Sequence, residues 1–176
     1  MPAFNEAKSL VVVVPQTLAA LKQLSPRVEL IVVDDGSQDN TASVMQQVCA
    51  AHAEVRYLKL SRNFGKESAL TAGLDTGRGE VLVQMDADGQ HPTALLSEML
   101  LKWQQGAAVV YALRKAREDQ SALQAGLIGL FYKLINWGSH IDIPANAGDF
   151  RLMDRKVVNA LKAMPERNRF MKGMYA

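Results

Sequence analysis

Short β-branched and other apolar runs alternate with helical patterns along this chain, and that alternation constrains the fold more than any other feature. The strand-like runs are residues 29–33, 55–60, 80–85 and 107–112. The helical patterns that follow three of them are residues 41–52, 67–75 and 92–104. Such a β-α alternation predicts an α/β fold, with a mostly parallel sheet that is covered by helices.

Two segments fit this scheme less readily. Val11 to Val14 have the composition of a strand, yet they stand inside a helical pattern between Glu6 and Leu24, which Pro15 would kink or restart. Residues 121–137 carry apolar side chains at helical spacing, with few polar residues on the opposite face.

Length and composition indicate a single globular domain over residues 1–176. The one cysteine, Cys49, excludes an internal disulfide and cannot make a zinc site alone. No apolar run approaches the roughly 18 residues that span a bilayer. The formal charge of +2 is uneven, with its basic excess after residue 150. A basic end suits phosphates or an anionic membrane surface, and a solvated helix face explains it equally well.

Three strand-like runs end in unusually polar loops, which carry the first functional argument. The loops are residues 34–37 (DDGS), 62–66 (RNFGK) and 86–90 (DADGQ). In an open parallel sheet, ligands bind beyond the carboxyl ends of the strands. If the strands lie side by side, these loops converge on one site.

The familiar phosphate-binding loops and the EF-hand are absent, so a divalent cation is the expected partner of the acidic loop. Leu82 stands where the third glycine of G-x-G-x-x-G belongs, and Leu60 replaces the first glycine of a P-loop. Mg²⁺ and Mn²⁺ prefer oxygen ligands and often combine one or two carboxylates with substrate phosphates. In extended backbone, Asp86 and Asp88 face the same side and could serve one metal–nucleotide unit.

Three alternatives compete for the acid pair. A surface turn that caps the helix after Pro92 is the structural one. A phosphatase of the haloacid dehalogenase type also begins from strand-D-x-D, but that motif wants Thr or Val where Gln90 stands. A phosphoacceptor receiver domain could use Asp34, Asp35, Asp86 and Lys115, but it leaves the loop at 62–66 unexplained.

Five stretches resemble, in order, the motifs of family-2 glycosyltransferases with a GT-A fold. They look most like polyprenyl-phosphate glycosyltransferases, which include dolichyl-phosphate mannose synthase and the bactoprenol glucosyltransferases. The stretches are residues 2–6 (PAFNE), 32–41 (VVDDGSQDNT), 62–66 (RNFGK), 86–92 (DADGQHP) and 147–155 (AGDFRLMDR). The resemblance implies a Rossmann-like, mostly parallel sheet flanked by helices.

The same resemblance implies roles for individual residues. Those implied to bind the nucleotide sugar are Pro2, Ala3, Phe4, Asn5, Glu6, Asp35, Lys66, Asp86, Ala87 and Asp88, with Asp35 reaching the base or ribose. Those implied to hold Mg²⁺ or Mn²⁺ on the diphosphate are Asp86, Asp88 and Gln90. Those implied to act in catalysis or on the acceptor phosphate are Asp149, Arg114, Arg117 and Arg151, with Asp149 as the candidate base or positioning group.

The implied reaction is an inverting, metal-dependent transfer of a hexose from a nucleotide sugar to a polyprenyl phosphate, at the cytoplasmic face of the membrane. UDP-glucose is the preferred donor, and GDP-mannose is the alternative. Residues 121–137 would lie at the membrane surface, although a core or dimer helix fits them nearly as well. No nucleic-acid partner is expected, and a homo-oligomer is left open.

Two departures from the family pattern predict an incomplete domain. Relatives carry a first strand before the PAFNE stretch, where this chain has only Met1, and they continue beyond the position of Ala176 into a basic tail and usually transmembrane helices. We therefore expect a gap beside the nucleotide, at the place of that strand. An inactive, truncated nucleotide-binding module is the alternative function.

Overall fold

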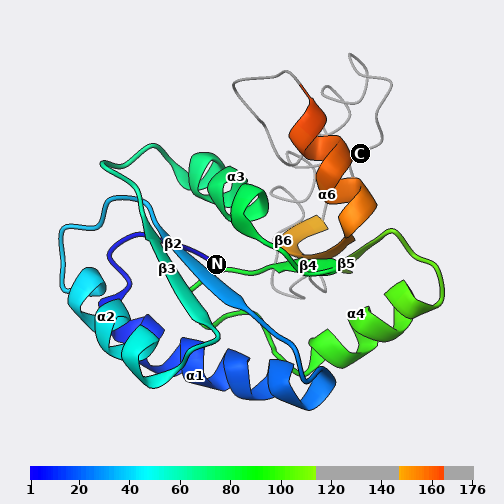
Figure 1. Ribbon diagram of the computed structural model, residues 1–176, viewed down its shortest axis with the longest axis horizontal. Helices are drawn as coiled ribbons and strands as arrows, with labels where there is room; N and C mark the ends of the chain where they lie inside the picture. Colours follow the sequence, from blue (N-terminus) through cyan, green and yellow to red (C-terminus); the bar gives the residue numbers. More distant parts are fainter. Residues whose placement is uncertain (114–146, 165–176) are drawn as a thin grey trace, which may run out of the picture.

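The computed structural model describes residues 1–113 and 147–164, in which helices pack on both faces of two three-stranded sheets (Figure 1). The strands are β1 (Pro2–Ala3), β2 (Leu30–Asp34), β3 (Val55–Lys59), β4 (Val81–Gln84), β5 (Val109–Leu113) and β6 (Ala147–Asp154). The helices are α1 (Ala7–Leu24), α2 (Thr41–Ala51), α3 (Lys66–Thr76), α4 (Leu95–Gln104) and α6 (Arg155–Ala163). The predicted α/β class is confirmed.

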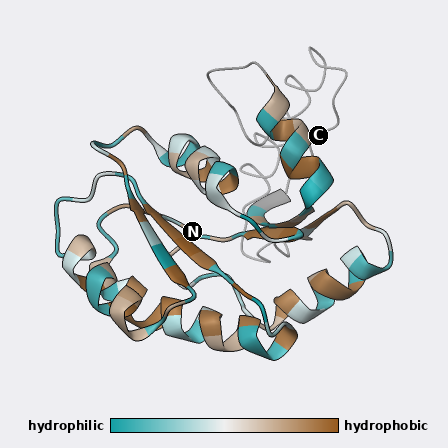
Figure 2. Ribbon diagram, in the orientation of Figure 1, coloured by the Kyte–Doolittle hydropathy of each residue, from teal (hydrophilic) through white to brown (hydrophobic). Residues whose placement is uncertain are grey.

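The first sheet is parallel, in the order β1-β2-β3. Its middle strand, β2, has the sequence LIVVD and is hydrophobic along most of its length (Figure 2). Val32 and Val33 are almost completely buried, because helices cover β2 on both faces. A continuous apolar run is what a strand buried on both faces requires.

The second sheet has the order β4-β6-β5, and β6 runs antiparallel to both neighbours. Its register pairs Gln84 with Arg151 and Val110 with Leu152. The sequence reading included residues 147–154 in a motif but did not predict a strand there. Asp149 and Arg151 interrupt the apolar pattern of this segment, so the pattern does not indicate a strand. Phe150, Leu152 and Met153 of β6 are nevertheless buried.

The helices divide between the two faces of the sheets: α1, α2 and α4 lie on one, and α3 and α6 on the other (Figure 1). On the first face, Leu10 of α1 and Met45 of α2 pack with Val32 of β2. On the second, Leu74 of α3 and Val158 of α6 pack with Met153 of β6. In the part of the chain described, no helix is long and apolar enough to cross a membrane.

Residues 11–14 belong to α1, which resolves the ambiguity of their strand-like composition. The buried residues of α1 are Leu10, Val13, Val14, Thr17 and Leu18, a spacing of three and four residues that defines one helical face. Val11 and Val12 point away from it and are about half exposed. The helix continues through Pro15. Tertiary burial of the Leu10 face therefore decides the structure over β propensity.

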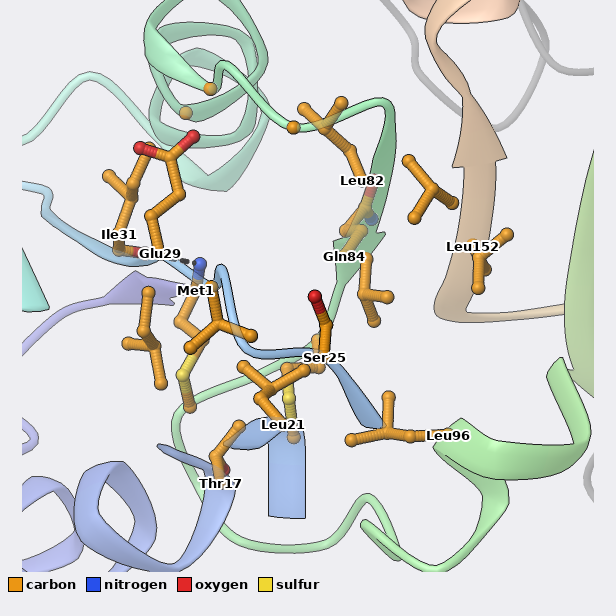
Figure 3. A pocket seen from close by; sticks show the side chains of 18 of the residues that line it. Met1, Thr17, Leu21, Ser25, Glu29, Ile31, Leu82, Gln84, Leu96 and Leu152 are labelled. Atoms are coloured by element: carbon orange, nitrogen blue, oxygen red, sulfur yellow. Dashed lines mark hydrogen bonds between the residues drawn. The ribbon is translucent and has the colours of Figure 1, made fainter. Parts of the chain in front are cut away.

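A cavity of about 810 Å³ lies between the two sheets. Figure 3 shows its walls: Met1 and Ile31 on the side of the first sheet, and Leu82, Gln84 and Leu152 on the side of the second. The Met1 amino group donates a hydrogen bond to the Ile31 carbonyl oxygen at 2.8 Å. Burial there lowers the pKa of the Met1 amine from 8.0 to about 5, against the opposing effect of Asp86.

Candidate functional site

A second cavity, of about 340 Å³, lies at the carboxyl ends of four strands. The residues that line it are Pro2, Ala3, Phe4, Glu6, Asp35, Asn63, Gly65, Lys66, Asp86, Ala87 and Asp88. The predicted convergence of the polar loops is therefore confirmed. The loops converge although β3 and β4 belong to different sheets.

The loop after β2 holds two buried carboxylates with different partners. Asp34 is fully buried, and it accepts hydrogen bonds from the Ser37 backbone amide at 2.7 Å and from the Tyr57 hydroxyl. Burial and the Asp34 carboxylate raise the pKa of Tyr57, so the hydroxyl stays a donor. Asp35 lines the cavity and accepts from the backbone amides of Phe64 at 2.7 Å and Gly65 at 2.8 Å. Asp35 thus fixes the loop that carries Lys66.

Gly36 allows the loop after β2 to approach the loop after β3. A Cβ atom at Gly36 would lie 2.4 Å from the Arg62 carbonyl carbon and 2.7 Å from the Asn63 amide nitrogen. Its φ angle is +73°, which side-chain-bearing residues rarely adopt. The close contact brings Asn63 and Lys66 to the edge of the cavity.

Strand β1 and the loop after it supply four of the five nucleotide-pocket residues implied by the PAFNE stretch. Pro2, Ala3, Phe4 and Glu6 line the cavity, whereas Asn5 does not. Asn5 has a φ angle of +56°, and its side-chain oxygen accepts from the Gln38 amide at 2.9 Å. Asn5 therefore joins two loops of the site.

The loop after β4 presents Asp86 and Asp88 to the cavity, as the i and i+2 spacing predicts. His91 closes this loop on itself, since its Nδ1 accepts from the Asp86 backbone amide at 3.0 Å. The Gln90 amide donates to Oδ1 of Asp88 at 2.9 Å. Gln90 is exposed and is not among the residues that line the cavity. The sequence reading gave His91 no role, although its place in the DADGQHP stretch was visible.

Lys66 connects the acidic loop after β4 to Asp149 of β6. Its Nζ lies 2.7 Å from Oδ1 of Asp86 and 2.7 Å from Oδ2 of Asp149. Burial alone would lower the pKa of Lys66, but the two carboxylates outweigh burial and raise it. The ammonium is therefore charged at neutral pH. The sequence reading placed Lys66 near the nucleotide but did not predict either contact.

The remaining predicted residues divide between β6 and the segment that is not described. Arg151 is buried in β6, where it pairs with Gln84 of β4 and Tyr111 of β5. Arg114, Arg117 and the helix expected at 121–137 lie outside the described residues. Their predicted roles therefore stay predictions.

The residues present at the cavity fit a divalent cation. Oδ1 of Asp86 is buried and receives no well-aligned hydrogen bond from the described part of the chain, so its contact with Lys66 is ionic. Asp88 is exposed beside it. Within residues 1–113 and 147–164, no group of three His, Cys, Asp or Glu side chains could hold a metal. A site with two carboxylates, in which phosphate oxygens complete the coordination of the metal, is typical of a metal that binds together with phosphates.

The profile of the family described as "Glycosyl transferase family 2" matches residues 1–162. A bactoprenol glucosyl transferase of Shigella phage SfV is 41% identical over 99% of this chain and 57% of its own length. An uncharacterized glycosyltransferase of Synechocystis sp. is 43% identical over the whole chain and 55% of its own length. The chain thus spans about half the length of these relatives.

Solved structures show the same GT-A fold at low sequence identity. A mannosyltransferase of Pyrobaculum calidifontis, in complex with GDP-Man and Mn²⁺, has a TM-score of 0.61 at 20% identity, over 93% of this chain and 46% of its own. A glucosyl-3-phosphoglycerate synthase of Mycobacterium tuberculosis, in complex with Mn²⁺ and UDP-glucose, has a TM-score of 0.59 at 19% identity, over 89% and 55%.

Proposed function

Because this chain belongs to glycosyl transferase family 2, we propose that it transfers glucose from UDP-glucose to a polyprenyl phosphate, with inversion at the anomeric carbon. The observation that carries the proposal is that Asp86 and Asp88 line one cavity and that Lys66 joins Asp86 to Asp149, in a chain 41% identical to a bactoprenol glucosyl transferase. The relatives' names support both the sugar and the lipid acceptor.

In the proposed complex, the nucleotide occupies the cavity between the β1–α1 loop and Asp35. Asp86 and Asp88, with Gln90 as the third predicted ligand, would hold Mg²⁺ or Mn²⁺. The bound ion would supply a Lewis acid for the diphosphate leaving group. Lys66 stands at the same wall of the cavity, where its ammonium can meet diphosphate oxygens. Both solved neighbours named above contain Mn²⁺ with a nucleotide sugar.

Asp149 is the residue of β6 that we assign to the acceptor side. The ammonium of Lys66 contacts the carboxylates of both Asp149 and Asp86. An acceptor group near Asp149 is therefore also near the donor's sugar. An acceptor phosphate is already ionised at neutral pH and needs no strong base. Asp149 therefore positions the acceptor, with Arg151, Arg114 and Arg117 proposed to neutralise its phosphate. The acceptor would be reached from the cytoplasmic face of the membrane.

The test is a transfer assay with radiolabelled UDP-glucose and polyprenyl phosphate in detergent micelles, with Mn²⁺ or with a chelator. We expect lipid-linked glucose that depends on the metal and is lost in Asp88→Ala. GDP-mannose in place of UDP-glucose tests the alternative donor. Product formed undiminished by Asp88→Ala contradicts the metal assignment.

An inactive nucleotide-binding module is the second candidate, because a cavity divides the two sheets. Calorimetric titration separates it from the first. Donor binding without any lipid-linked product, from the same folded preparation, would favour the module.

A further inference from the structure

Lys66 lies between two carboxylates, Asp86 in the loop after β4 and Asp149 in β6. The last pair of the β4–β6 ladder is Gln84 with Arg151, and Asp86 and Asp149 each lie two residues beyond it. Two carboxylates that share one site repel each other. The ammonium of Lys66, 2.7 Å from each carboxylate, offsets that repulsion.

The location of Lys66 in α3 strengthens the case that it serves these carboxylates. Lys66 is the first residue of α3, and a positive charge at a helix N-terminus is opposed by the helix dipole. Within α3 the charge is therefore unfavourable. Its side chain is 43% exposed, whereas Asp86 and Asp149 are each 23% exposed, so the ammonium reaches inward from the pocket rim.

We propose that Lys66 is an internal counter-ion, which holds the place of the divalent cation in the empty site and moves to the diphosphate when the nucleotide sugar binds. This inference rests on the proposed function, because it takes Asp86 to be a metal ligand. It adds a mechanism by which metal binding and nucleotide binding are coupled.

The coupling follows from competition for one oxygen atom. Oδ1 of Asp86 contacts the Lys66 ammonium in the structure. A metal ion bound to the same oxygen, at about 2.1 Å, would be repelled by that ammonium. Metal alone must therefore displace Lys66 from Asp86 and leave its ammonium with the Asp149 contact but no replacement for Asp86. A nucleoside diphosphate provides such a partner in the same cavity. The cation and the diphosphate should consequently bind better together than apart.

Mn²⁺ titration monitored by electron paramagnetic resonance tests this inference, with and without UDP. In wild-type protein we expect UDP to increase Mn²⁺ affinity strongly. In Lys66→Met we expect Mn²⁺ alone to bind roughly two- to fivefold more tightly, the size set by a half-exposed ion pair, and the increase due to UDP to shrink. Lys66→Arg keeps the charge and should resemble wild type. Lys22→Met, which removes a lysine paired with Glu54 on the surface, is the matched control.

Two outcomes are distinguishable. Wild-type protein that binds no Mn²⁺ even with UDP overturns the metal assignment of the proposed function. Wild-type protein that binds Mn²⁺, while Lys66→Met shows the same affinity and the same UDP effect, overturns the counter-ion role alone.

A measurement on wild-type protein removes any dependence on how the variant folds. With ¹⁵N-labelled lysine, the Lys66 ammonium resonance should shift when Mg²⁺ and UDP are added together. It should then couple to the ³¹P nuclei of the diphosphate. A resonance that keeps its position and shows no contact with phosphorus overturns the inference.

Discussion

The imidazole of His91 stacks on the ring of Phe150, with centroids 4.9 Å apart and planes inclined by 9°. Phe150 is buried in β6, immediately after Asp149. His91 thus links the acidic loop after β4 to the strand that carries the proposed acceptor-side carboxylate. Its Nδ1 accepts the Asp86 amide, which leaves the proton of the neutral ring on Nε2.

This link predicts different effects for two substitutions of His91. His91→Phe keeps an aromatic ring against Phe150 but leaves the Asp86 amide without its acceptor, at a cost of about 1–3 kcal/mol. His91→Asn keeps an acceptor and loses the stack. We expect His91→Phe to weaken Mn²⁺ binding more than His91→Asn does, as measured by calorimetry. The reverse order would show that the ring contact, and not the hydrogen bond, fixes the loop.

Gly36→Ala should destabilise the protein more than the same substitution at Gly106. Both glycines have positive φ angles, +73° and +103°. A Cβ atom at Gly106 meets nothing within 4 Å, whereas one at Gly36 would collide with the Arg62–Asn63 backbone. We expect Gly36→Ala to cost about 1–3 kcal/mol beyond Gly106→Ala in urea unfolding. Equal losses would mean that φ strain alone explains the effect.

Asp88→Asn should lower kcat/KM for metal-dependent transfer by about a hundredfold or more, since a metal at a developing charge supplies several kcal/mol. The amide keeps the shape of the side chain and can still accept from the Gln90 backbone. Asp75→Asn, an exposed carboxylate of α3, is the matched control and should leave transfer unchanged. Donor binding measured with a chelator present should be the same in both variants.

The stability of a chain that begins at Met1 should fall as the pH drops from 8 to 5. The Met1 amine has a pKa of about 5 in the folded protein and 8.0 when unfolded, so the unfolded state binds more protons over that range. Protonation therefore favours unfolding, by ~4 kcal/mol at pH 5. Urea unfolding at several pH values measures this loss. A chain acetylated at Met1 should lack this contribution, and an identical pH dependence would exclude the amine as its source.

The sequence predicts the repeating elements well because their signals are local. Residues 30–34 form a strand and residues 41–51 a helix within one residue of the predicted limits, since apolar periodicity and turn residues act over a few positions. The same holds for the acidic pair, because Asp86 and Asp88 follow a strand and face one cavity. The family resemblance then assigns the pocket residues of β1 and of the loop after it.

What the sequence did not reveal depends on pairs that are far apart along the chain. Lys66 and Asp149 are separated by 83 positions, and no local pattern announces their contact. β6 lies between β4 and β5, where Phe150 and Leu152 pack into the core, and this tertiary packing leaves no local signal in the sequence. Asn5 is similar, since its turn toward Gln38 reflects a backbone conformation that its residue type permits but does not require.

The central position of β6 also sets the order in which the site can assemble during synthesis. A nascent chain that has emerged only as far as residue 113 contains β4 and β5 but not the strand that joins them. Pairings between distant segments form slowly, because a long loop must close first. The nucleotide-side loops therefore emerge from the ribosome well before Asp149 does. Until then, the edges of β4 and β5 that will pair with β6 are open to capture by chaperones or by other nascent chains.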